Sequence, residues 1–139
     1  MTAKEYLLRY KEASRDVIDT LEELENLRSL ITQVKAAQSD SERIKASGNQ
    51  DPLGDAMVKL IMMENELKSR VEDMKSIIEE IKETISKVKD DDLSRLLYKR
   101  YIALKSWEKI AIEMDYSYRW VLRLHGNALK KVEEILKSS

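Results

Sequence analysis

The stretch SWEKIAIEMDYSYRWVLRLHGNALKK, residues 106–131, contains two segments with helical apolar spacing, separated by three residues. The first segment follows Ser106, a residue type that commonly caps helices, and ends at Asp115. Its apolar residues recur at i, i+3, i+4 and i+7: Trp107, Ile110, Ala111 and Met114. This spacing predicts a short helix with one buried face.

The second segment follows Ser117, another candidate cap, and predicts a longer helix. Its buried stripe is predicted to consist of Val121, Leu124, Ala128, Val132 and Ile135. A short helix, a three-residue turn and a longer helix form the helix-turn-helix arrangement, whose second helix can enter the major groove of DNA.

The charges of the second segment favour a polyanionic ligand. No Asp or Glu occurs from Tyr116 to Val132, and acidic residues would repel phosphate. The residues predicted to face DNA lie off the apolar stripe: Tyr118, Arg119, Leu122, Arg123, Lys130 and Lys131. The two arginines can each hydrogen-bond a guanine edge, whereas Tyr118 and Leu122 can contact a thymine methyl or the sugar backbone. The lysines, farther along, are expected to contact phosphates. The alternative is a solvated basic face on a three-helix bundle.

Three other residues in this stretch have structural interpretations. We expect Trp107 to lie in the core, because it belongs to the apolar face of the first segment. His125 is expected at the surface or facing phosphate, since no catalytic partner for it is visible. Gly126 weakens a helix by roughly 1 kcal/mol relative to Ala, so it is expected to permit close approach by another helix or by DNA.

A seven-residue apolar repeat dominates the first 90 residues. It places ten residues on one seam: Ala3, Tyr6, Tyr10, Ala13, Val17, Thr20, Leu24, Leu27, Ile31 and Val34. A second seam follows: Met57, Leu60, Glu64, Leu67, Val71, Met74, Ile78, Ile81, Ile85 and Val88. Repeats of this length predict helices that pack along a left-handed seam. Residues from about 37 to 52 lose the repeat and predict a loop, with Asp51 as cap and Pro52 as the first residue of the next helix.

The simplest fold for these segments is an antiparallel coiled-coil hairpin over residues 1–90. Leu7, Leu21, Leu30 and Ile61 lie off the seams. They either pack inside an irregular hairpin or widen its apolar face enough to require a partner. Because a lone two-helix hairpin buries its core poorly, we expect a homo-oligomer, with a dimer favoured.

The KDDDLSRLLYKRYIALKSW stretch, residues 89–107, opens the second part. Its triple Asp, residues 90–92, is expected to cap a helix rather than to bind a divalent cation. The helix from about Leu93 to Leu104 is predicted to bury Leu93, Leu96, Leu97, Tyr101 and Leu104. Its basic residues, Arg95, Lys99 and Arg100, are expected to remain for solvent or phosphate.

Composition limits the possible functions. The 139 residues include no Cys and one His, so thiolate and His-cluster metal sites are excluded and we expect no cofactor. No apolar run is long enough to cross a bilayer, and we expect a cytoplasmic protein without membrane contact. Residues 1–92 carry 15 Lys and Arg against 21 Asp and Glu, a net charge of −6, whereas residues 93–139 carry 10 against 5, a net charge of +5. DNA binding is therefore expected in the second part, and we expect no enzymatic activity.

LLYKRYIALKSWEKIAIEMDYSYRWVLRLHGNALKKVEEIL, the stretch from Leu96 to Leu136, resembles the fourth-region helix-turn-helix of sigma-70-type factors. It is more similar to phage and prophage regulators of the RinA/ArpU type. The resemblance implies DNA-facing side chains at Tyr118, Arg119, Leu122 and Arg123, with Ser117 at a phosphate. Leu122 departs from the pattern, because such factors often have a basic or polar residue there, and the other sigma regions are lacking.

The sequence thus predicts an all-α protein with a hairpin for assembly, residues 1–90, and a helix-turn-helix for DNA binding, residues 91–139. The resemblance implies a phage-type transcription regulator, an activator of late genes, that acts on double-stranded DNA in a bacterial host, at the nucleoid, with host RNA polymerase as a further candidate partner. Two alternatives remain open. One is a protein like a phage small terminase subunit, and the other is a coiled-coil interaction module that binds an acidic protein instead of DNA.

Overall fold

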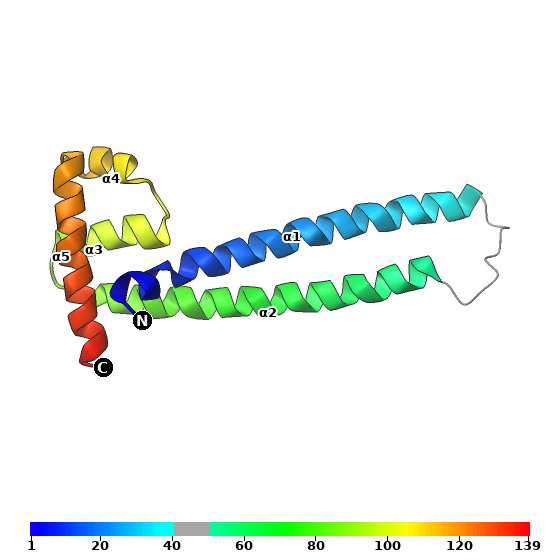
Figure 1. Ribbon diagram of the computed structural model, residues 1–139, viewed down its shortest axis with the longest axis horizontal. Helices are drawn as coiled ribbons and strands as arrows, with labels where there is room; N and C mark the ends of the chain where they lie inside the picture. Colours follow the sequence, from blue (N-terminus) through cyan, green and yellow to red (C-terminus); the bar gives the residue numbers. More distant parts are fainter. Residues whose placement is uncertain (41–50) are drawn as a thin grey trace. The chain divides into compact units, whose positions relative to one another are not determined.

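The computed structural model describes residues 1–40 and 51–139, and every regular element in these two ranges is helical (Figure 1). The expected all-α class is therefore confirmed. The elements are α1 (Ala3–Asp40), α2 (Pro52–Ser86), α3 (Asp91–Leu97), the π-helical turn η1 (Tyr98–Ile102), α4 (Trp107–Met114) and α5 (Tyr118–Lys137).

Two compact units divide the chain: residues 1–14 with 73–139, and residues 15–72. The helices α1 and α2 contribute a segment to each unit. The predicted division at residue 90 and the continuous hairpin over residues 1–90 both stay predictions. Within the first unit, however, the beginning of α1 and the end of α2 belong to the same hydrophobic core as α3, α4 and α5.

In the first unit, α1 and α2 run antiparallel and are joined by polar contacts. The Tyr6 hydroxyl lies 2.8 Å from the Thr84 hydroxyl, and Arg9 pairs with Glu80 at 2.7 Å. Burial raises the pKa of Tyr6. Since residue numbers increase along α1 as they decrease along α2, these contacts define the antiparallel direction.

In the residue 15–72 unit, α1 buries its seam more completely than α2. The buried residues are Val17, Thr20, Leu24, Leu27 and Ile31. From Pro52 to Glu72 in α2 no residue is buried, and Leu60, Leu67 and Val71 are half-buried. An ion pair between Arg28 and Glu64, 3.1 Å apart, joins the two segments. Glu64, the polar residue in the second seam, thus has a charged partner.

The predicted loop lies mostly outside the described residues. At its start the prediction was wrong, because residues 37–40 continue α1. At its end the prediction is confirmed: α2 begins at Pro52, and the Asp51 carboxylate accepts a hydrogen bond from the Gly54 backbone N–H at 3.0 Å. The side chain thus satisfies a free amide of the first turn.

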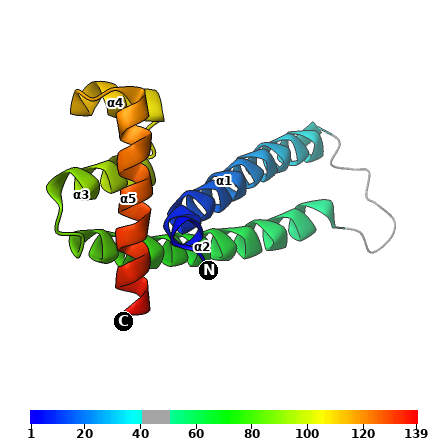
Figure 2. The same cartoon turned by 60° about the vertical axis from the view of Figure 1, so that its left-hand side comes forward.

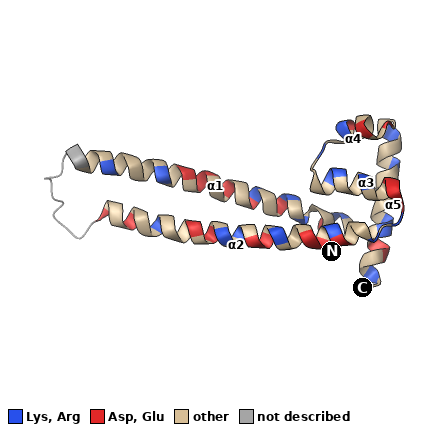
Figure 3. Ribbon diagram, turned by 180° about the vertical axis from the view of Figure 1, so that it is seen from behind, with Lys and Arg blue, Asp and Glu red and all other residues tan. Residues whose placement is uncertain are grey.

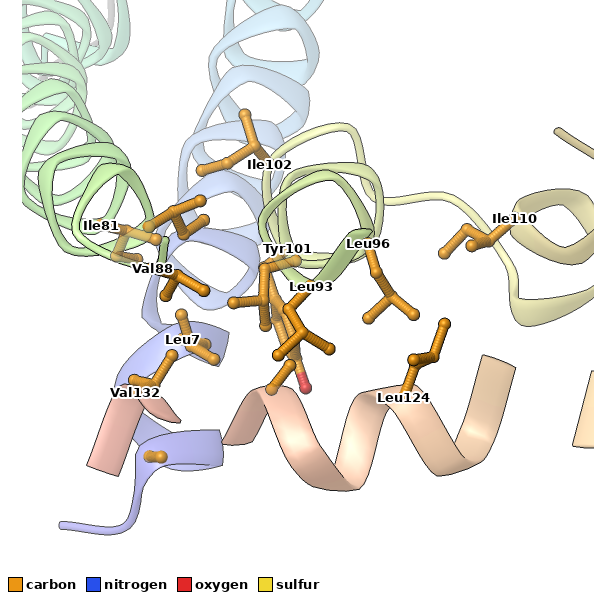
Figure 4. Packing of buried hydrophobic residues seen from close by; sticks show 14 of the residues in the cluster. Leu7, Ile81, Val88, Leu93, Leu96, Tyr101, Ile102, Ile110, Leu124 and Val132 are labelled. Atoms are coloured by element: carbon orange, nitrogen blue, oxygen red, sulfur yellow. The ribbon is translucent and has the colours of Figure 1, made fainter. Parts of the chain in front are cut away.

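Residues from every helix of the first unit form its core (Figure 4). Leu96 lies between Ile110 of α4 and Leu124 of α5, so α3 is packed against both helices of the helix-turn-helix. Leu7 of α1 lies beside Val132 near the end of α5 and is fully buried. Leu7 lies off the predicted hairpin seam. In the structure it packs in the core that contains residues of α3, α4 and α5.

The helix that starts at Asp91 differs from its prediction in the last turn. Leu93, Leu96, Leu97 and Tyr101 are buried as expected, but Leu104 is 40% exposed. The π-helical turn η1 shifts the register after Leu97, and the left-handed backbone of Leu104, with φ of 56°, ends the helix. The Asp90 side chain accepts a hydrogen bond from the Leu93 N–H at 3.1 Å, so the predicted capping role is confirmed.

Candidate nucleic-acid interface

A tight turn joins α4 to α5. Asp115 adopts the left-handed conformation, with φ of 58° and ψ of 44°, which Asp tolerates better than most residues. The Tyr116 N–H donates to the Ala111 carbonyl at 3.0 Å and the Asp115 N–H donates to the Ile112 carbonyl at 3.2 Å. This is the Schellman pattern, which satisfies carbonyls at the end of α4 and reverses the chain.

Ser106 and Ser117 cap the two helices as the sequence predicts. The Ser106 hydroxyl accepts from the Lys109 N–H at 3.2 Å, and the Ser117 hydroxyl accepts from the Trp120 N–H at 3.1 Å. Ser117 is exposed, so its other hydrogen-bonding capacity faces solvent. Both views of the fold show α4 across the beginning of α5 and α3 beside its middle (Figure 2).

The buried stripe of α5 is confirmed at four positions: Val121, Leu124, Ala128 and Val132. Ile135 is half-buried. Arg119, Arg123 and Lys130 lie on the opposite side, because each residue of an α-helix advances by about 100°. All three are exposed. The stripe therefore orients the arginines away from the core.

The other predicted contact residues lie on the two flanks of this face. Tyr118 and Leu122, 47% and 40% exposed, share one flank. Lys131 is exposed on the other flank, where it lines a surface groove with Lys87, Lys89 and Glu134. The arginines, Lys130, Tyr118 and Leu122 are thus on adjoining parts of α5, whereas Lys131 belongs to a separate surface.

Three cations close to α4 are engaged by side-chain contacts, unlike most of those of α5. Lys99 and Lys105 both bind Glu113, at 2.7 and 2.8 Å, and their hydrogen bonds lower the pKa of Glu113 to about 2. The Arg100 guanidinium stacks over the Trp107 ring, 4.3 Å from its centroid. The expectation that Lys99 and Arg100 are left for phosphate was therefore wrong.

Within the described part of the chain, four cations of α5 form no ion pair: Arg119, Arg123, Lys130 and Lys131. Lys137 pairs with Glu133 at 3.4 Å. Lys and Arg segments recur along α5 (Figure 3). Four cations without an ion pair thus lie on α5 before Glu133.

His125 does not face outward, and its prediction as a surface or phosphate-facing residue was wrong. Its Nε2 lies 2.6 Å from the Tyr101 hydroxyl, and its ring is edge-on to Trp107 with centroids 4.5 Å apart. Burial, with Lys4 and Arg100 nearby, lowers the pKa of His125 to about 4. A neutral imidazole therefore joins α5 to η1 and α4. The sequence feature that could have predicted this position is the spacing of His125, which lies four residues after Val121 and three before Ala128.

Tyr116 anchors the beginning of α5 to α3. Its hydroxyl donates to the Asp92 carboxylate at 2.5 Å, and this hydrogen bond raises the pKa of Tyr116. Trp120, 42% exposed, packs edge-on to Tyr116 with centroids 6.5 Å apart. The sequence singled out neither contact. Together with the Tyr101–His125 pair, they hold the end of α5 that carries Arg119 and Arg123.

Comparison with protein-family models, curated proteins and solved structures finds no match to this chain. None of the described helices combines the length and the apolar run that would cross a bilayer. Over the same residues, no three His, Cys, Asp or Glu side chains gather as a metal-binding group. The candidate binding surface is the exposed face of α5 that carries Arg119, Arg123 and Lys130.

Proposed function

We propose that this chain is a sequence-specific DNA-binding protein that reads the major groove with α5. The observation that carries the proposal is the placement of Arg119 and Arg123. They are exposed and unpaired at the beginning of the second helix of a helix-turn-helix, on the side away from the core. Recognition helices contact base edges with residues in that region.

The proposed contacts follow from the chemistry of each side chain. Arg119 and Arg123 each offer two parallel donors to the O6 and N7 acceptors of guanine. Tyr118 and Leu122, on the adjoining flank, provide apolar surface for a thymine methyl or the sugar backbone. Ser117 is assigned to a phosphate.

The lysines and the other charges on and around α5 complete the proposed interface. Lys130 is assigned to a phosphate, a contact that positions the protein without reading sequence, whereas the predicted phosphate contact of Lys131 would lie on a separate surface. From Tyr116 to Val132 no carboxylate opposes DNA. Asp92, which lies at the beginning of α3, accepts a hydrogen bond from the Tyr116 hydroxyl. The free positive charge of α5 is therefore available to replace phosphate counterions.

The resemblance to RinA/ArpU-type regulators extends the proposal to phage transcription, as an activator of late genes. The protein would then act in the bacterial cytoplasm, at the nucleoid, with host RNA polymerase as a second partner. This role includes no enzymatic step and no cofactor. A small terminase subunit would share the DNA-binding surface, and ring assembly in solution would distinguish it from a dimeric regulator.

Self-association is proposed for the residue 15–72 unit. Val58, Ile61 and Met62 of α2 are 59%, 55% and 66% exposed. They recur at i, i+3 and i+4 and so share one face of the helix. Because none of the α2 residues in this unit is buried, a second copy is the proposed cover for this face, and a dimer is favoured.

The test compares Arg119→Ala, Arg123→Ala and Lys130→Ala in the full chain. Affinity is measured for a site selected from random DNA and for random-sequence duplex, at several salt concentrations. Each arginine variant should lose more affinity for the selected site, since a bidentate base contact contributes roughly 1–3 kcal/mol of discrimination. The lysine variant should weaken binding to both DNAs and reduce the salt slope by about one unit.

Three outcomes would contradict parts of this proposal. Equal losses on both DNAs for the arginine variants would limit the pair to phosphate contact. Unchanged binding by both variants would move DNA away from this face of α5. If the wild-type chain ignores all DNA and instead binds an acidic protein, the interaction module is correct.

A further inference from the structure

Gly126 has no structural explanation within the described fold. It lies in the interior of α5 and is exposed. A Cβ atom at this position would meet no described atom within 4 Å. Its backbone is helical, with φ outside the left-handed region that favours glycine. Neither backbone conformation nor packing in this chain therefore requires glycine there, although glycine weakens a helix interior.

The position of Gly126 on α5 relates it to the proposed DNA interface. It follows Arg119 by seven residues, or about two helical turns, and precedes Lys130 by four. All three residues share the face opposite the buried stripe, and Arg123 lies on the same side. The missing side chain leaves a short length of helix backbone uncovered between unpaired cations.

We infer that Gly126 is where a sugar-phosphate strand of bound DNA passes closest to α5. This inference rests on the proposed function and adds a contact to it. Seven residues of α-helix span about 10 Å, so Gly126 lies well behind Arg119 along the helix axis. If Arg119 reaches base edges in a groove about 12 Å wide, Gly126 lies near the groove's rim, where the backbone runs.

The chemistry of the neighbouring side chains fits this occupant. Lys130 follows Gly126 by four residues and can hold a phosphate beside the close approach. A side chain at position 126 would separate the strand from α5 and lengthen this contact. The sugar-phosphate backbone is the same for every base sequence, so this effect is independent of the base sequence.

The test uses Gly126→Ala and Gly126→Leu in the full chain, with Asn127→Ala as the matched control. Asn127 is the exposed neighbour of Gly126, on a flank of the helix, and its replacement by Ala also favours the helix. Melting temperature is measured for each variant. Affinity is measured for random-sequence duplex and for a site selected from random DNA.

Gly126→Ala should raise the melting temperature by about 3 °C. The same variant should weaken binding to both DNAs by about tenfold, which is roughly 1.4 kcal/mol, and Gly126→Leu should weaken it further. Asn127→Ala should raise the melting temperature without changing either affinity more than about twofold. A more stable protein that binds DNA less well is the result that separates an interface role from a structural one.

Other results would overturn the inference. If Gly126→Ala lowers the melting temperature, the glycine serves packing. If it raises the melting temperature and leaves DNA affinity unchanged, no strand approaches this position, although wild-type binding would still support the proposed function. If Gly126→Ala reduces the sedimenting mass and leaves the DNA affinity of the protomer unchanged, the surface that approaches Gly126 belongs to a second copy of the chain. Failure of the wild type to bind DNA would overturn both proposals.

Discussion

Replacement of Leu7 by Ala tests whether the beginning of α1 is part of the helix-turn-helix core. Leu7 is fully buried in the hydrophobic cluster that includes Val88 of α2 and Val132 of α5. It lies 84 residues before the first residue of α3, so the sequence alone would assign it to a separate assembly element. The structure predicts that its loss destabilises residues 91–139.

The magnitude follows from the burial of the side chain. Leu→Ala substitutions in close-packed cores lower the free energy of unfolding by roughly 2–5 kcal/mol, through lost transfer energy and the cavity left behind. For Leu7, which has no exposed surface, we expect about 3 kcal/mol. The matched control is Leu21→Ala, in the same helix but 41% exposed, for which we expect less than about 1 kcal/mol.

Tryptophan fluorescence during denaturant unfolding is the assay. Both tryptophans, Trp107 and Trp120, lie in the helix-turn-helix, so their signal reports on that part of the chain. Leu7→Ala should lower the midpoint of the tryptophan transition, and Leu21→Ala should change it little. A tryptophan midpoint that is unaffected by Leu7→Ala would refute the shared core. Fragment 91–139 should accordingly lack a cooperative tryptophan transition.

Two further predictions concern protonation and assembly. His125 has a folded pKa of about 4 against an ordinary value of 6.5, so the unfolded chain binds a proton first as pH falls. Stability should therefore decrease between about pH 6.5 and pH 4, by about 1–2 kcal/mol after allowance for partial exposure, and a His125→Phe variant should lack this component in urea titrations at each pH. For assembly, Ile61→Lys with Met62→Lys should lower the sedimenting mass at unchanged helicity, whereas the exposed control Ser69→Lys should not. If the wild-type chain sediments as a monomer, the proposed dimer is wrong.

Local features of the helix-turn-helix could be predicted from sequence because they depend on neighbouring residues. The caps at Ser106 and Ser117 need only a hydroxyl three residues before an amide. The buried stripe from Val121 to Val132 follows from the helical period alone. For the same reason the exposure of Arg119 could be predicted, although its ligand could not.

Features that depend on tertiary contacts escaped prediction. The π-helical turn after Leu97 exposes Leu104, and no local sequence pattern predicts this turn. The burial of His125 depends on Tyr101, which is 24 residues earlier in the chain. The role of Leu7 was not predicted because a seven-residue repeat describes contacts within a hairpin, whereas Leu7 belongs to a core cluster that also contains residues of α3, α4 and α5.

The beginning and the end of α5 are held by different parts of the chain. A substitution near the end can therefore lower the stability of the protein without changing its preference between DNAs. The beginning, which carries Arg119, is held by the Tyr116–Asp92 hydrogen bond and the Tyr101–His125 pair. The end is held where Val132 meets Leu7 (Figure 4). Loss of Leu7 therefore removes support far from Arg119 and Arg123. Under conditions in which Leu7→Ala remains folded, its preference between selected and random DNA should be retained, because the arginines keep their local anchors.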